Sequence, residues 1–321
     1  MKDAWGRTIE YVRLSLTDAC NFCCPYCRPA EITPQSQTQL LSVDEWMKIL
    51  GAFHHIGVKA VRLTGGEPLL YPHIEELLSR IKESGWFEDI SMTTNGSLLA
   101  SRAQRLKKFG LNRVNISLDS LETEAFATCV GKTGQLESVL DGIRSAINAN
   151  FKSVKINTVL SRYWSDDEVK SLLQYVEKWP VVWRFIEYMP FQGDAFHGPT
   201  FDEWKEQLER ASGGTLTEVH SVYGFGPATY LALPSGKAVG FIFSMSHSYC
   251  DTCNRVRLTS DGQMRLCLLR DDEADLVSLV RNGASEEALA KHIERALQRK
   301  QERHDGIGME QPERPMWRIG G

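Results

Sequence analysis

Cys20-Asn21-Phe22-Cys23-Cys24-Pro25-Tyr26-Cys27 follows an apolar run, residues 11–16, that predicts a strand. Within it, Cys20, Cys24 and Cys27 have C-x3-C-x2-C spacing, with an aromatic residue directly before the last cysteine. Three thiolates on one short loop can bind three irons of a [4Fe-4S] cube, whereas such cubes are ordinarily held by four thiolates. The fourth iron would be open, and an open position is typical of a metal site that binds a substrate or cofactor.

Two other uses of these cysteines compete with a cluster. A disulfide is unfavourable because the N-terminus does not resemble a signal peptide, and cytosolic thiols stay reduced. Zinc is a better alternative, since Cys20, Cys23, Cys24 and Cys27 offer four ligands. Zinc sites, however, usually divide their ligands between two separated pairs, and this crowding strains a tetrahedron. If a cluster binds, Cys23 is a spare thiol, although its C-x2-C register with Cys20 competes with the assignment of Cys24.

The composition is that of a globular protein. The chain has 321 residues, 42% of them hydrophobic, which excludes intrinsic disorder and allows one large core with a smaller second one. Its 37 basic and 41 acidic residues give a net charge of −4, so no overall cationic field attracts nucleic acid or anionic membranes. No apolar run approaches the ~18 residues that span a bilayer. We therefore expect a cytoplasmic protein that binds neither nucleic acid nor membrane.

Strands and helices alternate along the first part of the chain. Six strands are predicted over residues 11–16, 58–64, 89–95, 113–119, 153–160 and 181–189, with helices over 42–55, 72–82, 98–109, 135–148 and 165–179. This order is typical of a parallel α/β sheet or barrel. Because six units are too few for a closed eight-stranded barrel, the sequence predicts an α/β fold with a partial (β/α)6 TIM-like barrel, open on one side.

Polar residues lie near the predicted carboxyl ends of these strands, where parallel barrels bind their ligands. The cysteine loop follows the first strand, and Gly65-Gly66-Glu67-Pro68 follows the second, where glycines let the backbone approach a ligand. Buried charges need a partner. Three arginines, Arg13, Arg62 and Arg184, either pair with carboxylates such as Glu67, Asp119 and Glu187 or together form a cationic basin for an anionic ligand. For the whole set, we favour the basin.

Beyond residue 191 the pattern predicts an α+β extension, with a helix over 201–212 and short strands over 216–222, 229–233, 239–245 and 255–258. This extension contains a second thiol triad, Cys250, Cys253 and Cys267. One interpretation is a zinc site completed by His247 or His220, and the other is a second cluster with an open iron. Arg255 and Arg257 alternate along a predicted strand, so both point to one side, where their guanidiniums suit phosphate or a purine edge.

The first cysteine spacing resembles the signature of the radical S-adenosylmethionine (SAM) superfamily, and Gly65-Gly66-Glu67-Pro68 resembles its second motif. The chain also has the second triad, Arg255, Arg257 and an end of Ile319-Gly320-Gly321. With these features the sequence is similar to the GTP 3′,8-cyclase family of molybdenum cofactor biosynthesis. The similarity covers nearly the whole chain and includes Gly6-Arg7, residues 115–119 and residues 184–189.

The resemblance implies two [4Fe-4S] clusters, the first on Cys20, Cys24 and Cys27 with SAM on its open iron, the second on Cys250, Cys253 and Cys267 with guanine on its open iron. It implies SAM contacts from Tyr26, Gly66, Glu67, Ser117 and Met189. It implies GTP contacts from Arg13, Arg62, Thr93, Lys155, Arg255, Val256 and Arg257. Five of the implied site residues would be catalytic: Arg13, Arg255, Arg257, Gly320 and Gly321.

The implied reaction is that of a lyase. A 5′-deoxyadenosyl radical from SAM takes the ribose C3′ hydrogen of GTP, and the C3′ radical attacks guanine C8, giving (8S)-3′,8-cyclo-7,8-dihydroguanosine 5′-triphosphate. The arginines would hold the triphosphate so that C3′ faces the radical. Gly320 and Gly321, which lack side chains, would thread into the active site.

The resemblance also implies partners: GTP as substrate, a reducing partner such as flavodoxin, and the next enzyme of the pathway, cyclic pyranopterin monophosphate synthase. A homodimer is compatible with it. We expect two domains, residues 1–191 with the first cluster and residues 192–321 with the second cluster and the Gly-Gly tail. Two other classes stay open: a radical SAM peptide-modifying enzyme with an auxiliary cluster, and a non-enzymatic zinc or iron–sulfur module.

Overall fold

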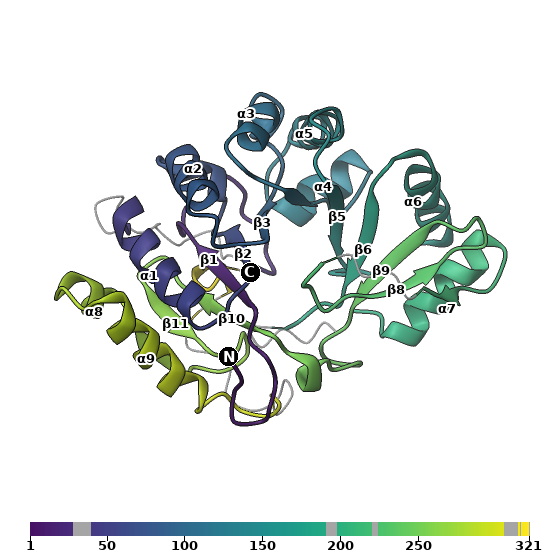
Figure 1. Cartoon of the computed structure of the whole chain (residues 1–321). Helices are drawn as coiled ribbons and strands as arrows, with labels where there is room; N and C mark the ends of the chain where they lie inside the picture. The colour runs from purple at the N-terminus through teal and green to yellow at the C-terminus, as the bar shows by residue number, and fades with distance from the viewer. Residues whose placement is uncertain (28–39, 191–197, 220–223, 305–313, 315, 321) are drawn as a thin grey trace.

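The computed structural model describes residues 1–27, 40–190, 198–219, 224–304, 314 and 316–320. These residues form a curved sheet of 12 strands with helices packed against it (Figure 1). The strands are β1 (Tyr11–Ser15), β2 (Ala60–Thr64), β3 (Asp89–Thr94), β4 (Arg113–Ser117), β5 (Ser153–Val159), β6 (Val182–Ile186), β7 (Thr217–Glu218), β8 (Thr229–Ala232), β9 (Ala238–Ile242), β10 (Arg255–Leu258), β11 (Gln263–Arg265) and β12 (Glu273–Asp275). The α-helices are α1 (Val43–His55), α2 (Ile74–Ser84), α3 (Ala103–Lys108), α4 (Thr123–Val130), α5 (Leu136–Asn148), α6 (Asp166–Lys178), α7 (Phe201–Ser212), α8 (Val277–Arg281) and α9 (Glu286–Leu297), and the short 3-10 helices are η2 (Pro68–Leu70), η3 (Cys250–Thr252) and η4 (Met316–Arg318).

The sheet is open and mostly parallel. Its strand order is β12-β11-β10-β1-β2-β3-β4-β5-β6-β9-β8-β7, and β1 to β6 are parallel neighbours in chain order. This arrangement confirms the predicted partial (β/α)6 barrel. The C-terminal part of the chain extends the sheet at both edges, because β10 pairs in parallel with β1 and β9 pairs in parallel with β6. A division into domains at residues 191 and 192 stays a prediction.

The two faces of the sheet differ in polarity because side chains alternate along each strand. In β1, Val12 and Leu14 belong to the hydrophobic core, which they share with residues of the surrounding helices, whereas Tyr11, Arg13 and Ser15 lie on the opposite face. The same alternation runs through β2 to β5 and through β10. The concave face therefore carries polar side chains where many parallel barrels carry valine, isoleucine and leucine.

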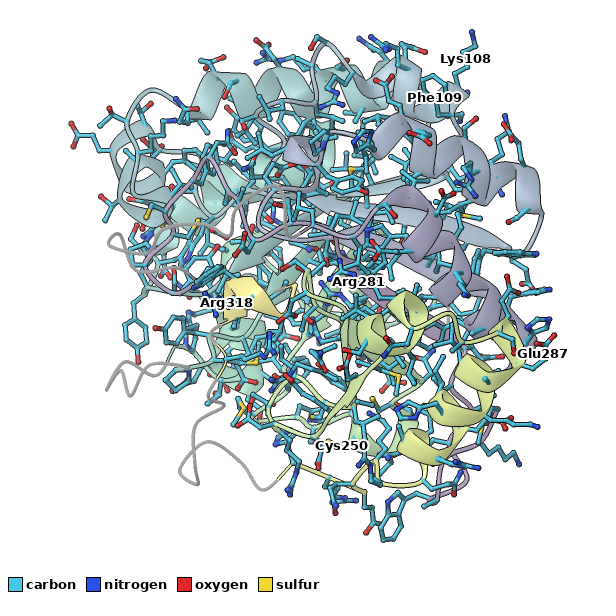
Figure 2. All side chains as sticks on the ribbon, turned by 90° about the vertical axis from the view of Figure 1, so that its left-hand side faces the viewer. Lys108, Phe109, Cys250, Arg281, Glu287 and Arg318 are labelled. Carbon is cyan, nitrogen blue, oxygen red and sulfur yellow. The ribbon has the colours of Figure 1, made fainter. Side chains whose placement is uncertain are left out.

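Helices from the C-terminal part of the chain pack against the N-terminal helix α1. Helix α9 packs on α1, and Arg281, the last residue of α8, pairs with Glu45 of α1 at 2.7 Å. Figure 2 views this side of the molecule, with α8 and α9 in yellow-green beside α1 in purple. No helix in the described ranges has the length and apolar character needed to cross a membrane.

Three local predictions need correction. Helix α3 begins at Ala103 and not at residue 98, because residues 96–102 form turns with Leu99 N bonded to Gly96 O and Arg102 N bonded to Leu99 O. Helix α4 was not predicted, since eight residues are too few for a clear helical period. Strand β7 covers two residues of the predicted strand over 216–222, of which 220–222 lie outside the described residues.

Candidate active site

The cysteine loop is fixed by the strand ends around it. Gly66 N donates to Thr17 O at 2.6 Å, and Glu67 N donates to Ala19 O at 2.8 Å. A Cβ on Gly66 would lie 2.3 Å from Ala19 O, so only glycine allows this approach. On the other side, Cys23 N donates to Val130 O of α4 at 2.9 Å. The loop is thus held at the carboxyl ends of the strands, where the barrel binds its ligands.

The first thiol triad converges on this loop. Burial raises the pKa of the Cys24 thiol well above its usual value, and the Asp119 carboxylate and the Cys27 and Cys20 thiols raise it further. Cys20 Sγ accepts weak hydrogen bonds from Phe22 N at 3.4 Å and from the Asn95 side chain at 3.9 Å. Soft thiol donors that crowd one another, with N–H groups directed at a sulfur, fit an iron–sulfur cluster.

The second thiol triad lines a cavity with about 530 Å³ of empty space, part of it open to solvent. Cys250, Cys253 and Cys267 share its wall with Arg255 and Arg257, and the wall is completed by Met189, Ser244, Tyr249, Val256, Leu266, Leu268, Leu269, Lys300 and His304. Three soft donors and several cations around one cavity fit a second cluster that faces an anionic ligand.

Two thiols of the second triad, those of Cys250 and Cys253, have lowered pKa values. Burial opposes ionisation of Cys250, but hydrogen bonds with His304 and Ser248 outweigh it and lower the pKa of this thiol to about 6. Burial likewise opposes ionisation of Cys253, yet the charges of Lys300 and Arg255 lower its pKa. Metal ligation requires thiolates, so both shifts favour it.

The described residues offer no direct support for the zinc alternative. Within the described ranges, no group of three or more histidine, cysteine, aspartate or glutamate side chains converges closely enough to hold a single metal ion. In a cube each thiolate binds a different iron, so its sulfurs stand farther apart than the ligands of one ion. His247 is exposed and stacks on Phe201 at 5.3 Å between ring centroids, and His220 lies outside the described residues. Among the described residues, His304 forms a hydrogen bond with Cys250.

Three arginines form a row across the concave face. In the parallel register, Arg13 pairs with Arg257 of β10 on one side and with Arg62 of β2 on the other. We call Arg257, Arg13 and Arg62 the arginine row. Arg255 lies two residues before Arg257 in β10, in register with Tyr11 of β1. Its guanidinium lies 5.0 Å from the centre of the Tyr249 ring. The sheet therefore places Arg255 and Arg257 beside the second triad, and Arg13 and Arg62 continue the row away from it across β1 and β2.

The cations of the concave face repel one another. Burial, then the charge of Arg257, lowers the pKa of Arg13 well below its usual range. Burial, then the charges of Arg184, Arg113 and Arg62, lowers the pKa of Lys155 to about 6. Lys155 is 3% exposed, and its register partner in β4 is Asn115. Such a set is costly until an anion neutralises it.

Several buried polar atoms of this face lack a hydrogen-bond partner among the described residues: Tyr11 OH, Ser15 Oγ, Thr93 Oγ1 and Arg255 Nε. Buried polar groups are ordinarily satisfied, so an unsatisfied group in a site calls for an absent ligand or water. These atoms and the cations around them fit a polyanion with further hydrogen-bonding groups, as a nucleoside triphosphate has.

Five predicted SAM contacts occupy different places. Tyr26 OH donates to Asp119 Oδ2 at 2.6 Å, and Gly66 lies against the cysteine loop. Ser117 ends β4. Glu67 is fully buried and accepts hydrogen bonds from Leu69 N, Thr94 Oγ1 and Asn95 N, so its carboxylate ties the turn after β2 to the end of β3. Met189 lines the second cavity, where Ser244 Oγ donates to its Sδ at 3.2 Å. Their contacts with SAM stay predictions.

The hydrogen bonds of Arg62 and Arg184 within the described residues differ from the alternative in which these arginines pair with Glu67, Asp119 and Glu187. Arg62 Nε donates to Ser91 Oγ at 3.2 Å, and Arg184 donates to the side-chain oxygens of Asn157 and Asn115 at 2.6 to 2.9 Å. The three carboxylates instead accept from loop groups, for example Asp119 from Val159 N at 2.8 Å and Glu187 from Met245 N at 2.6 Å. Glu67, Asp119 and Glu187 thus bind donors at the strand ends and loops, whereas Arg62 and Arg184 donate to neutral side-chain oxygens of the described residues.

The C-terminal tail reaches the arginine row. Arg257 Nη1 donates to Gly320 O at 2.8 Å, and a Cβ on Gly320 would lie 2.4 Å from Thr64 Oγ1. Gly320 is buried and has a φ of +71°, a backbone conformation that favours glycine. Gly321 lies outside the described residues.

Sequence reasoning missed the groups that support the second triad. His304 and Lys300 line its cavity, and Arg7 donates to Cys250 O at 2.9 Å. The only available signal was the Gly6-Arg7 dipeptide, which says nothing of its partner, because these contacts join residues that lie far apart along the chain.

Comparisons with known proteins agree with this geometry. The family described as radical SAM superfamily matches residues 14–176, and the one described as Molybdenum Cofactor Synthesis C matches residues 181–306. The chain is 38% identical over 327 residues to a GTP 3′,8-cyclase of Desulforamulus reducens and 38% identical over 329 residues to one of Heliobacterium modesticaldum, with 100% of each chain covered.

Among solved structures, SuiB of Streptococcus suis bound to S-adenosylmethionine matches with a TM-score of 0.65. At 15% identity, over 84% of this chain and 64% of SuiB, the match shows a shared fold. The two family matches and the full-length relatives go further than the fold. The chain belongs to the radical SAM superfamily and, within it, to the GTP 3′,8-cyclase family.

Proposed function

We propose that the chain is a radical SAM enzyme that cyclises GTP between ribose C3′ and guanine C8, with SAM and two [4Fe-4S] clusters as its cofactors. The observation that carries the proposal is the juxtaposition of the second thiol triad with Arg255 and Arg257 in one cavity, next in register to Arg13 and Arg62. A nucleotide bound there would place its base at the second cluster and its phosphates near the arginines.

When bound, the first cluster with SAM supplies the 5′-deoxyadenosyl radical that takes the C3′ hydrogen, after which C3′ bonds to C8 of the same guanine. Cys20, Cys24 and Cys27 would hold that cluster, and Cys250, Cys253 and Cys267 the second. Tyr26 is fixed by its hydrogen bond to Asp119, so its ring has one orientation near the first triad. A fixed orientation is what SAM binding would require of Tyr26, Gly66, Glu67, Ser117 and Met189.

The concave face would bind the triphosphate. Guanidinium groups suit phosphate because their planar forks bind two oxygens at once, and the arginine row offers several forks side by side. Lys155 would gain a proton when the triphosphate arrives, since a polyanion offsets the burial and the neighbouring cations that keep its pKa at about 6. Thr93 Oγ1 offers a further hydrogen bond to the substrate.

Val256 would act through its backbone. Its side chain belongs to the hydrophobic core, on the opposite face of β10 from Arg255 and Arg257, although the residue lines the second cavity. Gly320 and Gly321 would close the site from the tail, with Gly320 O on Arg257. In this role the tail excludes water and limits how far Arg257 can move.

Other components belong to the same proposal. A one-electron donor such as flavodoxin would reduce the first cluster, and cyclic pyranopterin monophosphate synthase would take the product. We place the enzyme in the cytoplasm, where its free thiols and clusters are protected from oxidation, and allow for a homodimer.

Anaerobic incubation of the reconstituted chain with SAM, GTP and dithionite tests the proposal. We expect 5′-deoxyadenosine and the cyclised nucleotide in equal amounts, and neither from a Cys24→Ser variant. Formation of 5′-deoxyadenosine without consumption of GTP would indicate a different substrate, such as a peptide. A chain that binds zinc and takes up no iron would be a non-enzymatic module.

A further inference from the structure

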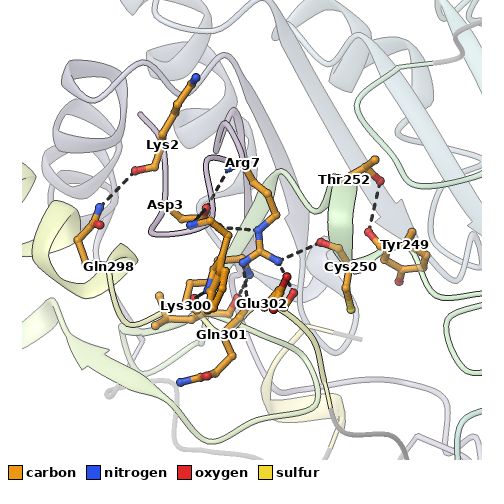
Figure 3. A network of polar contacts seen from close by, with 12 residues as sticks. Lys2, Asp3, Arg7, Tyr249, Cys250, Thr252, Gln298, Lys300, Gln301 and Glu302 are labelled. Carbon is orange, nitrogen blue, oxygen red and sulfur yellow. Dashed lines mark hydrogen bonds and ion pairs between the residues drawn. The ribbon is translucent and has the colours of Figure 1, made fainter.

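Arg7 lies at the centre of a network of polar contacts that includes Cys250, the first thiol of the second triad (Figure 3). Its Nη1 donates to Cys250 O at 2.9 Å and to Glu302 O at 2.6 Å, and its Nη2 donates to Gln301 O at 2.7 Å. Its Nε donates to Asp3 Oδ2 at 2.6 Å. One guanidinium thus joins the N-terminal turn, the loop of the first two thiols of the triad and the segment after α9.

The Arg7 guanidinium is built into the protein interior. The side chain of Arg7 is 7% exposed and that of Asp3 is 0% exposed. Asp3 Oδ1 also accepts from the backbone N–H groups of Trp5 and Arg7, both at 3.0 Å, so the turn over residues 3–7 is closed on itself. A hydrogen bond from a charged donor is among the stronger protein hydrogen bonds, worth about 1.5–3 kcal/mol.

The segment after α9 continues the connection to the remaining thiol. Lys300 is 4% exposed, and its ammonium group donates to Leu266 O, the carbonyl directly before Cys267. Trp5 Nε1 donates to Lys300 O at 2.9 Å, which holds the same segment to the N-terminal turn. The two halves of the second triad, which different loops supply, are therefore tied to one support.

We propose that Arg7 is a positioning residue for the second cluster: its guanidinium fork sets the Cys250 loop against the segment that carries Lys300 and, through it, against Cys267. The inference rests on the proposed second cluster and adds a support that lies outside the thiols and the nucleotide contacts. The positive charge of Arg7 alone would not hold these segments together. Three carbonyls in different directions need a planar group with several N–H donors.

Arg7→Lys is the informative variant. A lysine keeps the positive charge beside Asp3, so the N-terminal turn stays closed, but its single nitrogen does not span Cys250 O and Gln301 O. The matched control is Arg303→Gln, since Arg303 ties the same loop through Asp251 at 2.9 Å, with both side chains more than half exposed. Surface ion pairs contribute little, so the control predicts no change.

The full-length chain, reconstituted anaerobically, is treated with a ferrous chelator, and iron release is followed in time beside the spin count of the dithionite-reduced protein. We expect about eight irons in the wild-type chain and two phases of release. In Arg7→Lys one phase of iron release, about four irons, should be at least about tenfold faster, because a charged hydrogen bond is lost. The spin count of the dithionite-reduced variant should fall to about half of the wild-type value.

Each other outcome decides against the proposal. Wild-type release kinetics in Arg7→Lys, or an equal acceleration in Arg303→Gln, would overturn it. Loss of both clusters or an insoluble Arg7→Lys chain would overturn it too, because Arg7 would then support the whole fold and not one loop. A wild-type chain with only four irons would instead refute the proposed second cluster, and the two failures are thereby distinguished.

Discussion

Replacing Gly320 by alanine is expected to undock the C-terminal tail without harming either cluster. The new Cβ would lie 2.4 Å from Thr64 Oγ1 and 3.2 Å from Ser15 Cβ, and the backbone at this position has a φ of +71°. An alanine costs ~1 kcal/mol in this conformation, and overpacking of this kind costs ~2 kcal/mol. Together these weaken docking of the tail by about a hundredfold.

The assay compares Gly320→Ala with Gly283→Ala. Gly283 has a similar φ of +80°, but a Cβ there meets nothing within 4 Å, so it carries the backbone cost without the collision. We expect full iron content in both variants, faster hydrogen exchange over residues 316–320 in Gly320→Ala alone, and a loss of cyclisation of about a hundredfold in that variant. Normal turnover together with an undocked tail would refute the reasoning that the tail completes the site.

Three further predictions concern Lys155, two cysteines of the first loop, and Tyr26. In the folded chain Lys155 has a pKa of about 6 against an ordinary value of 10.5. Between these two pH values the unfolded chain binds one more proton than the folded chain, so the free energy of unfolding rises with pH. Lys155→Met should therefore flatten the rise of the melting temperature with pH in the substrate-free protein, and an unchanged slope would contradict the lowered pKa. Cys20→Ser should retain about four irons and Cys23→Ser about eight, and the reverse pattern would reassign the ligands. Tyr26→Phe removes the hydroxyl that donates to the buried Asp119 at 2.6 Å, so the free energy of unfolding measured with urea should fall by ~1–3 kcal/mol. The KM for SAM should rise in the same variant, and a KM equal to that of the wild type would mean that this hydrogen bond does not orient the ring.

The parallel sheet could be predicted because its signals are local. Apolar residues recur along each strand from β1 to β6, the longer helices such as α1 and α6 have a clear period, and the helix starts at Ser42 and Ser165 carry capping boxes. The pairing of β10 with β1 could not be predicted, since a hydrophobic pattern does not name the partner of a strand. Yet this pairing brings Arg257 into register with Arg13 and so creates the arginine row.

The candidate site divides in the same way. The thiol triads could be predicted from spacing along the chain, because the cysteines of each lie in one motif or in two nearby loops. The hydrogen-bond partners of the buried carboxylates could not be predicted from the spacing of residues along the chain. Glu67 and Asp119 accept hydrogen bonds from backbone and hydroxyl donors, and these contacts depend on how the loops around them fold. Burial raises the pKa of Glu67 to about 7, although hydrogen bonds from Asn95, Thr94 and Leu69 oppose this.

The most direct test of the account follows the hydrogen that leaves the ribose. GTP carrying deuterium at C3′ is turned over with SAM and dithionite, and the 5′-deoxyadenosine formed is analysed by mass spectrometry. A concave face that holds the triphosphate on its arginine row and the guanine at the second thiol triad should direct C3′ to the radical, so the account predicts one deuterium in 5′-deoxyadenosine. Unlabelled 5′-deoxyadenosine formed alongside consumption of the labelled GTP would contradict it.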